Sequence, residues 1–336
     1  MHVGERGAAG RNKPAPCLCA RNSCNGNTQL LQIRDKRYSV ATCCCTRAGA
    51  CLHKLSVFAT ANFAYAFLLR EAGTILRLSW LPFLLVTIIQ YFAMRAQLDA
   101  IRSTLEGGDI QALLTVSPPW RSQILAAVAM ILGIAIVAVA LHRIILFGDR
   151  QPECFVYLAF GKIEALFALL PIVLILAMGL GFLGLSAIAV ATSQVPIFFF
   201  LVWLCVWVAS AVLIVRLALI FPVTVVEGRY DFGQAWALTR GNFWRILALW
   251  IVVFIPVLII AGVLFAVIGF STVASRVDVR DQTSMLIELM ESLLFVQTII
   301  GYVWLVIGSA LGVAVLSYSY KALSGRQPDD FLTPRV

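Results

Sequence analysis

Seven of the nine cysteines in this 336-residue chain lie within its first 51 residues, and cysteine thiolates are common ligands of zinc. They are Cys17, Cys19, Cys24, Cys43, Cys44, Cys45 and Cys51. Zinc sites usually pair cysteines as CxxC motifs, whereas three adjacent cysteines cannot all reach one tetrahedral ion without backbone strain. We therefore predict no metal site and no cofactor. We interpret residues 1–56 as a disordered extension or as translated sequence upstream of the true start.

The residues that most often perform catalysis form no recognisable constellation. Of the three histidines, His2 and His53 fall in the N-terminal segment, and His142 stands near the end of an apolar run. The HExxH, GxSxG and Walker A patterns are absent from the sequence. Cys154 and Cys205 are isolated, which is typical of packing residues. We interpret His142 as a structural or interface residue and expect no enzymatic activity.

Six long apolar runs must position whatever site the chain contains. They cover residues 78–94, 124–146, 164–189, 195–215, 243–268 and 293–318. Each has roughly the 17 to 25 residues that a helix needs to cross about 30 Å of hydrocarbon, where the backbone must satisfy its own hydrogen bonds. Apolar residues make up 61% of the chain and charged residues 13%, far from the values of soluble proteins. These features predict an all-α, polytopic transmembrane bundle of about six spans over residues 57–322, followed by a short cytoplasmic tail, residues 323–336.

The positive charge is unevenly distributed. The first 56 residues carry +7 of the net charge of +9, so nothing in the remainder predicts a nucleic-acid partner. Beyond residue 56, twelve Lys and Arg residues fall on the side of the N-terminus and five on the other side. Because basic loops stay in the cytoplasm, we predict that both termini are cytoplasmic.

Short stretches beside the spans are predicted to be interfacial helices or plain connections. They cover residues 56–70, 97–105 and 284–295, and such helices lie in the headgroup plane.

Ionisable residues near the span ends predict the pairs Glu164 with Lys162, and Glu227 with Arg216 or Arg240. Four pairs of small residues at i and i+4 predict close helix packing, within the chain by preference and between chains as the alternative. They are Ala129 with Gly133, Ala177 with Gly181, Gly262 with Ala266, and Gly308 with Gly312. Pro171 and Pro256 are expected to kink their spans.

The segment between the fourth and fifth spans is the most specific. Pro222 predicts a break at the end of the fourth span, and Asp231 with Gln234 resembles the start of a capped helix. Four residues follow at helical spacing on one predicted face: Phe232, Trp236, Thr239 and Phe243. Tryptophan and arginine at this position are typical of the membrane interface. The predicted headgroup contacts are Arg216, Glu227, Arg229, Trp236, Arg240, Trp244 and Arg245.

The same segment carries a family resemblance. Residues 219–226 read Leu-Ile-Phe-Pro-Val-Thr-Val-Val and precede Glu227-Gly228, Ala235 and the run Thr-Arg-Gly-Asn-Phe-Trp-Arg at 239–245. This pattern resembles uncharacterised bacterial multi-pass inner-membrane proteins, which are similar to the membrane domain of glycerophosphodiester phosphodiesterases and to YciC-like proteins. The resemblance implies a six-span module in the inner (plasma) membrane of a bacterium. It implies no phosphodiesterase barrel, because no stretch supplies the strands or the metal ligands of that enzyme.

Two functions of different classes remain open. One is a non-enzymatic membrane protein with a role in scaffolding or in envelope and lipid homeostasis, whose partners are membrane lipids and other membrane proteins. Its arginines near the fourth and fifth spans would face anionic headgroups, each contributing on the order of 1 kcal/mol. The alternative is a transporter of small solutes or lipids that uses the kinked spans.

Overall fold

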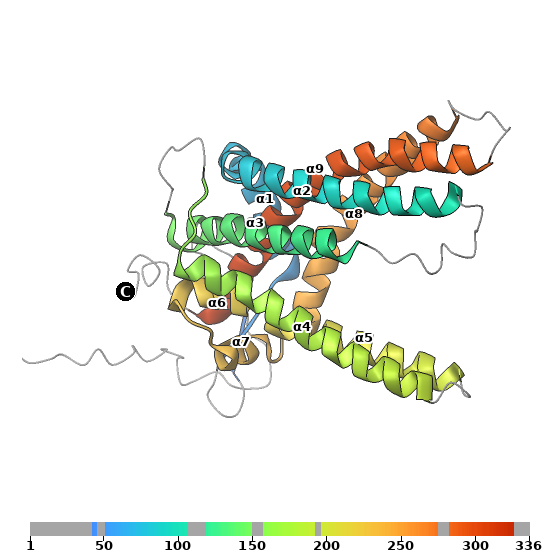
Figure 1. The fold of residues 1–336 in the computed structure, drawn as a ribbon. Coiled ribbons are helices and arrows are strands. Elements are labelled where there is room, and N and C mark those ends of the chain that lie inside the picture. The colour runs from blue at the N-terminus through green and yellow to red at the C-terminus, as the bar shows by residue number, and fades with distance from the viewer. Residues whose placement is uncertain are drawn as a thin grey trace, which may run out of the picture.

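The computed structural model is all-α apart from one short hairpin, within the residues that it describes. These are residues 42–45, 51–106, 119–149, 157–191, 196–274 and 282–325. The helices are α1 (Val57–Arg70), α2 (Ala72–Glu106), α3 (Trp120–Phe147), α4 (Lys162–Ala191), α5 (Pro196–Leu217), α6 (Ile220–Glu227), α7 (Phe232–Thr239), α8 (Phe243–Ala274) and α9 (Gln282–Ser324) (Figure 1). The hairpin pairs β1 (Thr42–Cys45) antiparallel with β2 (Cys51–Lys54), with Thr42 opposite Lys54.

Six stretches of helix are long and apolar enough to cross a membrane. They are Ala72–Thr104, Trp120–Phe147, Lys162–Gly181, Trp203–Glu227, Phe243–Ile268 and Leu289–Ser324. Each overlaps one of the six apolar runs, so the predicted fold class is confirmed. Cysteine-rich residues 1–41 and the tail beyond residue 325 lie outside the described residues.

The prediction of separate interfacial helices is wrong in two of three places. Residues 97–105 continue α2, which is 35 residues long, and residues 284–295 continue α9, which is 43 residues long. No proline or glycine separates these stretches from their spans, and an unbroken helix leaves no backbone group unpaired at the junction. Residues 57–70 do form a separate helix, α1, but it buries Ala61, Ala64 and Phe67 against the bundle.

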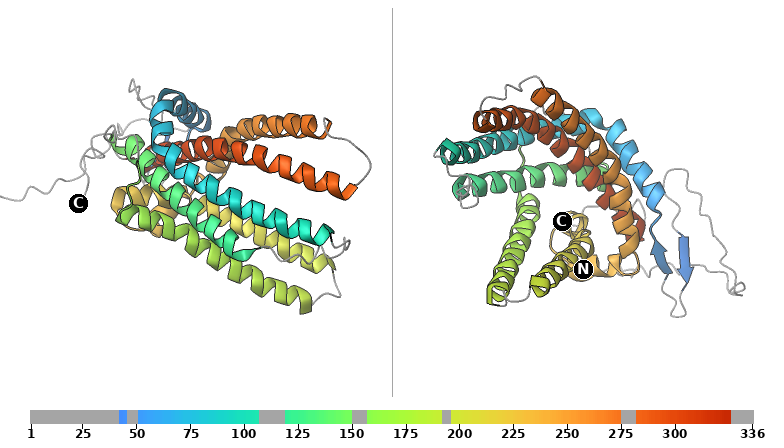
Figure 2. Two further views of the ribbon diagram at one scale, coloured as in Figure 1. Left: turned by 45° about the horizontal axis from the view of Figure 1, so that its top comes forward. Right: turned by 90° about the vertical axis from the view of Figure 1, so that its right-hand side faces the viewer.

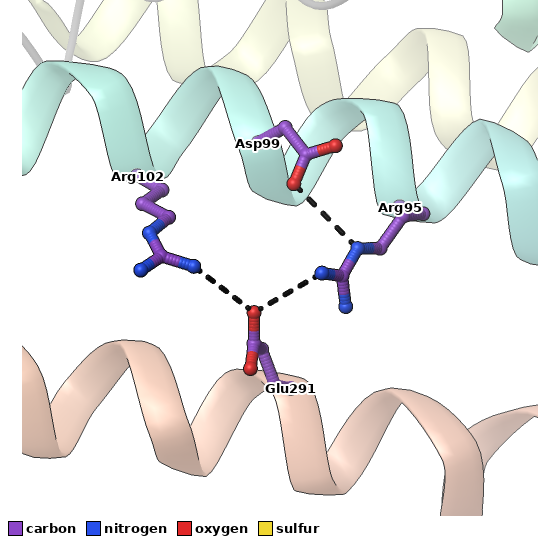
Figure 3. A network of polar contacts seen from close by, with 4 residues as sticks. All are labelled: Arg95, Asp99, Arg102 and Glu291. Carbon is purple, nitrogen blue, oxygen red and sulfur yellow. Dashed lines mark hydrogen bonds and ion pairs between the residues drawn. The ribbon is translucent and has the colours of Figure 1, made fainter.

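A network of charges joins the extensions of α2 and α9 (Figure 3). One carboxylate oxygen of Glu291 lies 3.4 Å from Nη2 of Arg95 and 3.4 Å from Nη1 of Arg102. Arg95 also lies 3.6 Å from Asp99, one turn away on α2. Charged side chains avoid hydrocarbon, so this network marks the level at which the two helices leave the predicted membrane core.

Small residues allow close packing at only some of the predicted pairs. A Cβ atom added to Gly133 would lie 2.6 Å from Cγ2 of Val86, so α3 approaches α2 closely there, and Gly312 faces the rings of Trp250 and Phe254 on α8. At Gly181 and Gly262 an added Cβ would meet no atom within 4 Å. The prediction of packing within the chain is therefore wrong for these two glycines.

The bundle divides at the end of α5. α5 ends at Leu217 and α6 begins at Ile220, two residues before Pro222, whose ring clashes with the preceding turn of a helix. The predicted break is confirmed. Figures 1 and 2 show that α4 and α5 form a hairpin that runs in one direction from the α7 region, whereas α8 runs in another.

Candidate functional site

Two tight turns position the segment that joins α5 to α8. Gly228 closes α6 with φ of 66°, and Gly241 lies between α7 and α8 with φ of 81°. Both angles fall in the left-handed region that glycine adopts without strain. Asp231 caps α7, because its side chain accepts a hydrogen bond from the amide of Gln234 at 2.8 Å, as the sequence predicted. These turns fold α7 back against α5.

The guanidinium of Arg216 lies between two aromatic rings at this fold-back. Its central carbon is 5.0 Å from the ring centroid of Trp236 and 5.6 Å from that of Phe243. Such contacts attract a cation to the negative face of each ring. Arg216 is partly buried, and its Nη1 atom is buried without a hydrogen-bond acceptor among the described residues. Three elements thus meet at Arg216: the last turn of α5, α7, and the first turn of α8.

Exposed basic and aromatic side chains belong to the same segment as this stack. Arg229, Arg240 and Arg245 are exposed, Trp236 is 48% exposed and Trp244 is 75% exposed. A tryptophan that remains exposed near arginines at the end of a span has the composition of the membrane interface. Six of the seven predicted headgroup contacts therefore lie at one end of the bundle. Five of them have exposed side chains, and the sixth, Arg216, is stacked on aromatic rings. The seventh, Glu227, is partly buried at the end of α6.

Other sequence predictions for this segment need correction. Phe232, Trp236, Thr239 and Phe243 do not share one face, because α7 ends at Thr239, which is buried, whereas Phe232 is 49% exposed.

Glu164 is buried and accepts a hydrogen bond from the amide of Gly161 at 2.9 Å, so it caps the start of α4. A capping carboxylate at the first turn is favoured by the helix dipole.

Two contacts at the start of α8 were not predicted from the sequence. Oδ1 of Asn242 accepts a hydrogen bond from the amide of Leu55 at 3.2 Å, and Nη1 of Arg245 donates one to the carbonyl of Leu55 at 2.9 Å. Asn242 is 3% exposed and Leu55 is 1% exposed. An asparagine just before a long helix predicts a cap, but no local signal predicts a partner 187 residues away.

His142 lies elsewhere, between α3, α4 and α9. It is fully buried, its Nδ1 lies 2.6 Å from Oγ of Ser317, and its ring packs against Phe167. Its Nε2 has no hydrogen-bond partner among the described residues. Polar contacts of this kind join helices in membranes, which agrees with the structural interpretation of His142. Within the described residues, no group of three or more His, Cys, Asp or Glu side chains is placed to hold a metal ion.

The fold defines a multi-pass helical membrane protein with six candidate spans. Compared with protein-family models, with curated proteins and with solved structures, the chain matches none. The resemblance to the membrane domain of phosphodiesterases therefore stays a prediction, and the basis for function is the site itself.

Proposed function

We propose that this protein is a non-enzymatic component of the bacterial inner membrane whose basic end contacts anionic phospholipid headgroups, in a scaffolding or lipid-homeostasis role. The observation that carries the proposal is the stack of Arg216 on Trp236 and Phe243, in a segment whose other arginines, Arg229, Arg240 and Arg245, are exposed. Each basic side chain near an anionic leaflet contributes about 1 kcal/mol of attraction.

The distribution of charge along the helices supports the same assignment. Beyond residue 56, nine described Lys and Arg residues lie at the end of the bundle that contains α6 and α7. They are Arg70, Arg77, Arg143, Lys162, Arg216, Arg229, Arg240, Arg245 and Lys321. The opposite end has Arg95, Arg102 and Arg121 among the described residues, and two of these are engaged with Glu291. The excess at one end favours a cytoplasmic location for that end.

The transporter alternative has less support. It depends on broken spans, and Pro171 and Pro256 lie within α4 and α8, which both continue past them. No observation on the described residues favours it over the lipid-facing role.

The selectivity of the reconstituted protein for spin-labelled lipids tests the proposal. Wild-type protein should retain spin-labelled phosphatidylglycerol in preference to phosphatidylcholine. The double variant Arg229→Gln/Arg240→Gln should lose several-fold in that preference, since about 1 kcal/mol per residue is about fivefold. The matched variant Arg229→Lys/Arg240→Lys keeps both charges and should behave as wild type. Equal selectivity in all three proteins would overturn the proposal.

Labelling of single cysteines tests which end of the bundle faces the cytoplasm. In a background without the nine native cysteines, Arg229→Cys and Asp99→Cys place single thiols at opposite ends of the bundle. A membrane-impermeant maleimide should label the second in intact cells and the first only after permeabilisation. The reverse pattern would contradict a cytoplasmic basic end.

A further inference from the structure

The outer parts of α5 and α8 have no protein neighbours on most of their surface. In α5, Phe200, Leu201 and Leu204 are 56%, 51% and 43% exposed. In α8, the consecutive residues Leu258, Ile259 and Ile260 are 52%, 60% and 61% exposed. Because successive residues on a helix point about 100° apart, exposure of neighbours in sequence means exposure on several faces. Apolar groups must therefore cover both helices from more than one side.

The two helices converge where the Arg216 stack lies. Arg216 is in the last turn of α5, Phe243 is the first residue of α8, and Trp236 is on α7 between them. From this point α5 and α8 diverge in all the views of Figures 1 and 2. The structure thus places a cation at the apex of two diverging apolar helices.

We propose that one anionic phospholipid binds at this apex, with its phosphate on Arg216 and its acyl chains between α5 and α8. The proposal rests on the lipid-facing role given above and names the ligand of that site. Phe200 and Arg216 are 16 residues apart, so α5 offers about 24 Å of apolar helix beneath the cation, more than half of the hydrocarbon thickness.

The chemistry of Arg216 suits a phosphate. A guanidinium presents a planar fork of donors that matches phosphate oxygens, and stacking on Trp236 and Phe243 holds that plane in place. Nη1 is buried and lacks an acceptor among the described residues, whereas Arg216 as a whole is only partly buried, so another part of the residue lies at the surface. A lysine at the same position would keep the charge but lose the fork and the stacking.

Native mass spectrometry of the full chain in detergent with added dioleoyl phosphatidylglycerol tests the proposal. Wild type should retain one lipid, and Arg216→Lys should need at least tenfold more lipid for the same occupancy. Arg121→Lys, a conservative change of an exposed arginine at the opposite end of the bundle, should leave occupancy unchanged. Equal occupancy of Arg216→Lys and wild type would overturn the proposal.

A second variant guards against a folding defect in Arg216→Lys. Trp236 is 48% exposed, so Trp236→Leu removes one ring of the stack without opening the core, and it should lower occupancy in the same direction. Phosphatidylglycerol with a photoreactive group in its acyl chain should crosslink to both α5 and α8 in wild type, and this crosslinking should fall in both variants. Crosslinks spread evenly over the exposed helices, or a dimer of this chain that covers α5 and α8, would overturn the lipid assignment.

The two proposals fail separately. If Arg216→Lys retains its lipid while Arg229→Gln/Arg240→Gln loses selectivity in bilayers, the single site is wrong and the lipid-facing role stands. If one lipid is retained but bilayer selectivity is absent in wild type, the broader role is wrong.

Discussion

Nη1 of Arg245 donates a hydrogen bond to the backbone carbonyl of Leu55, although 190 residues separate them in the chain. The amide of Leu55 is bonded in turn to Asn242, so one peptide segment before α1 is held on both sides by the first turn of α8. Tyr65 adds a third connection, because its hydroxyl donates to the carbonyl of Val253 at 2.7 Å. The contacts of the helical domain therefore include residues just before α1, next to the proposed lipid site.

Replacing Asn242 with alanine should destabilise this attachment. The substitution leaves the buried amide of Leu55 without its acceptor, which costs about 1–3 kcal/mol. Thermal unfolding in detergent measures the effect, with Arg240→Ala as the control because Arg240 is exposed. The order of melting temperatures should be wild type and Arg240→Ala above Asn242→Ala, and an Asn242→Ala protein as stable as wild type would contradict the role of this bond.

Two N-terminal deletions should differ although they differ by only two residues. Deletion of residues 1–54 keeps Leu55, whereas deletion of residues 1–56 removes the buried side chain of Leu55 and both of its hydrogen bonds. Loss of a buried leucine alone costs about 2–5 kcal/mol. The longer deletion should therefore melt at a lower temperature or express at a lower level, and equal behaviour would show that the attachment is dispensable.

Gly133→Ala should destabilise the protein, whereas Gly181→Ala should not. The new methyl group at residue 133 would lie 2.6 Å from Cγ2 of Val86 in the α2–α3 contact, and such overpacking costs about 1–3 kcal/mol. At residue 181 nothing lies within 4 Å, and alanine favours helix more than glycine does. Melting temperatures in detergent decide between them; a larger loss for Gly181→Ala would place the close helix contact elsewhere.

The sequence predicted best those features that the membrane imposes on length and composition. All six spans are present because crossing about 30 Å of hydrocarbon demands a long apolar helix. The ends of α2 and α9 were misjudged, because beyond the hydrocarbon neither apolarity nor length limits a helix. Gly133 and Gly181 stand in equivalent small-residue pairs, yet only one meets a neighbour, since the pattern permits close approach but does not choose the partner.

The candidate site was predictable in residue types but not in geometry. Arginine and tryptophan at the end of a span indicated an interface, which stays a prediction, and six of the seven residues lie at one end of the bundle as surface or stacked groups. The sequence offered Glu227 as a partner of Arg216, whereas the turns at Gly228 and Gly241 bring Trp236 and Phe243 to it. The attachment of Leu55 joins the residue before α1 to the start of α8, 187 to 190 residues away, and has no signature within any short window.

The charge network between α2 and α9 should contribute little and be sensitive to salt. Glu291 is 32% exposed in its side chain and its arginine partners are more exposed, so solvent screens the attraction. A double-mutant cycle with Glu291→Gln and Arg102→Gln should give a coupling energy of about 0.2–1 kcal/mol that falls as salt is raised. A coupling that does not change with salt would indicate a buried pair instead.

Tyr230 should make part of the stability depend on alkaline pH. Its hydroxyl donates to the carbonyl of Leu166 on α4, and burial raises the pKa of Tyr230 above its ordinary value of 10.0. The folded protein holds this proton more tightly than the unfolded chain, so the contribution is complete below pH 10.0 and is lost as pH rises through the raised pKa. Tyr230→Phe should lower stability by about 1 kcal/mol at neutral pH and weaken the alkaline loss. Melting temperatures of both proteins across that pH range measure the effect. Identical curves for the two proteins would contradict the role of Tyr230.

The uninterrupted course of α9 sets a fixed distance between the two membrane surfaces. Glu291 in the charge network and Lys321, which bonds to the carbonyl of Ile145 at the end of α3, are 30 residues apart, or about 45 Å along a helix. That length equals the thickness of a bilayer with its headgroups. A helix without proline cannot shorten, so a thinner membrane must tilt α9 and, with it, the helices attached at both ends. The orientation of the bundle is thereby coupled to the thickness of the surrounding lipid.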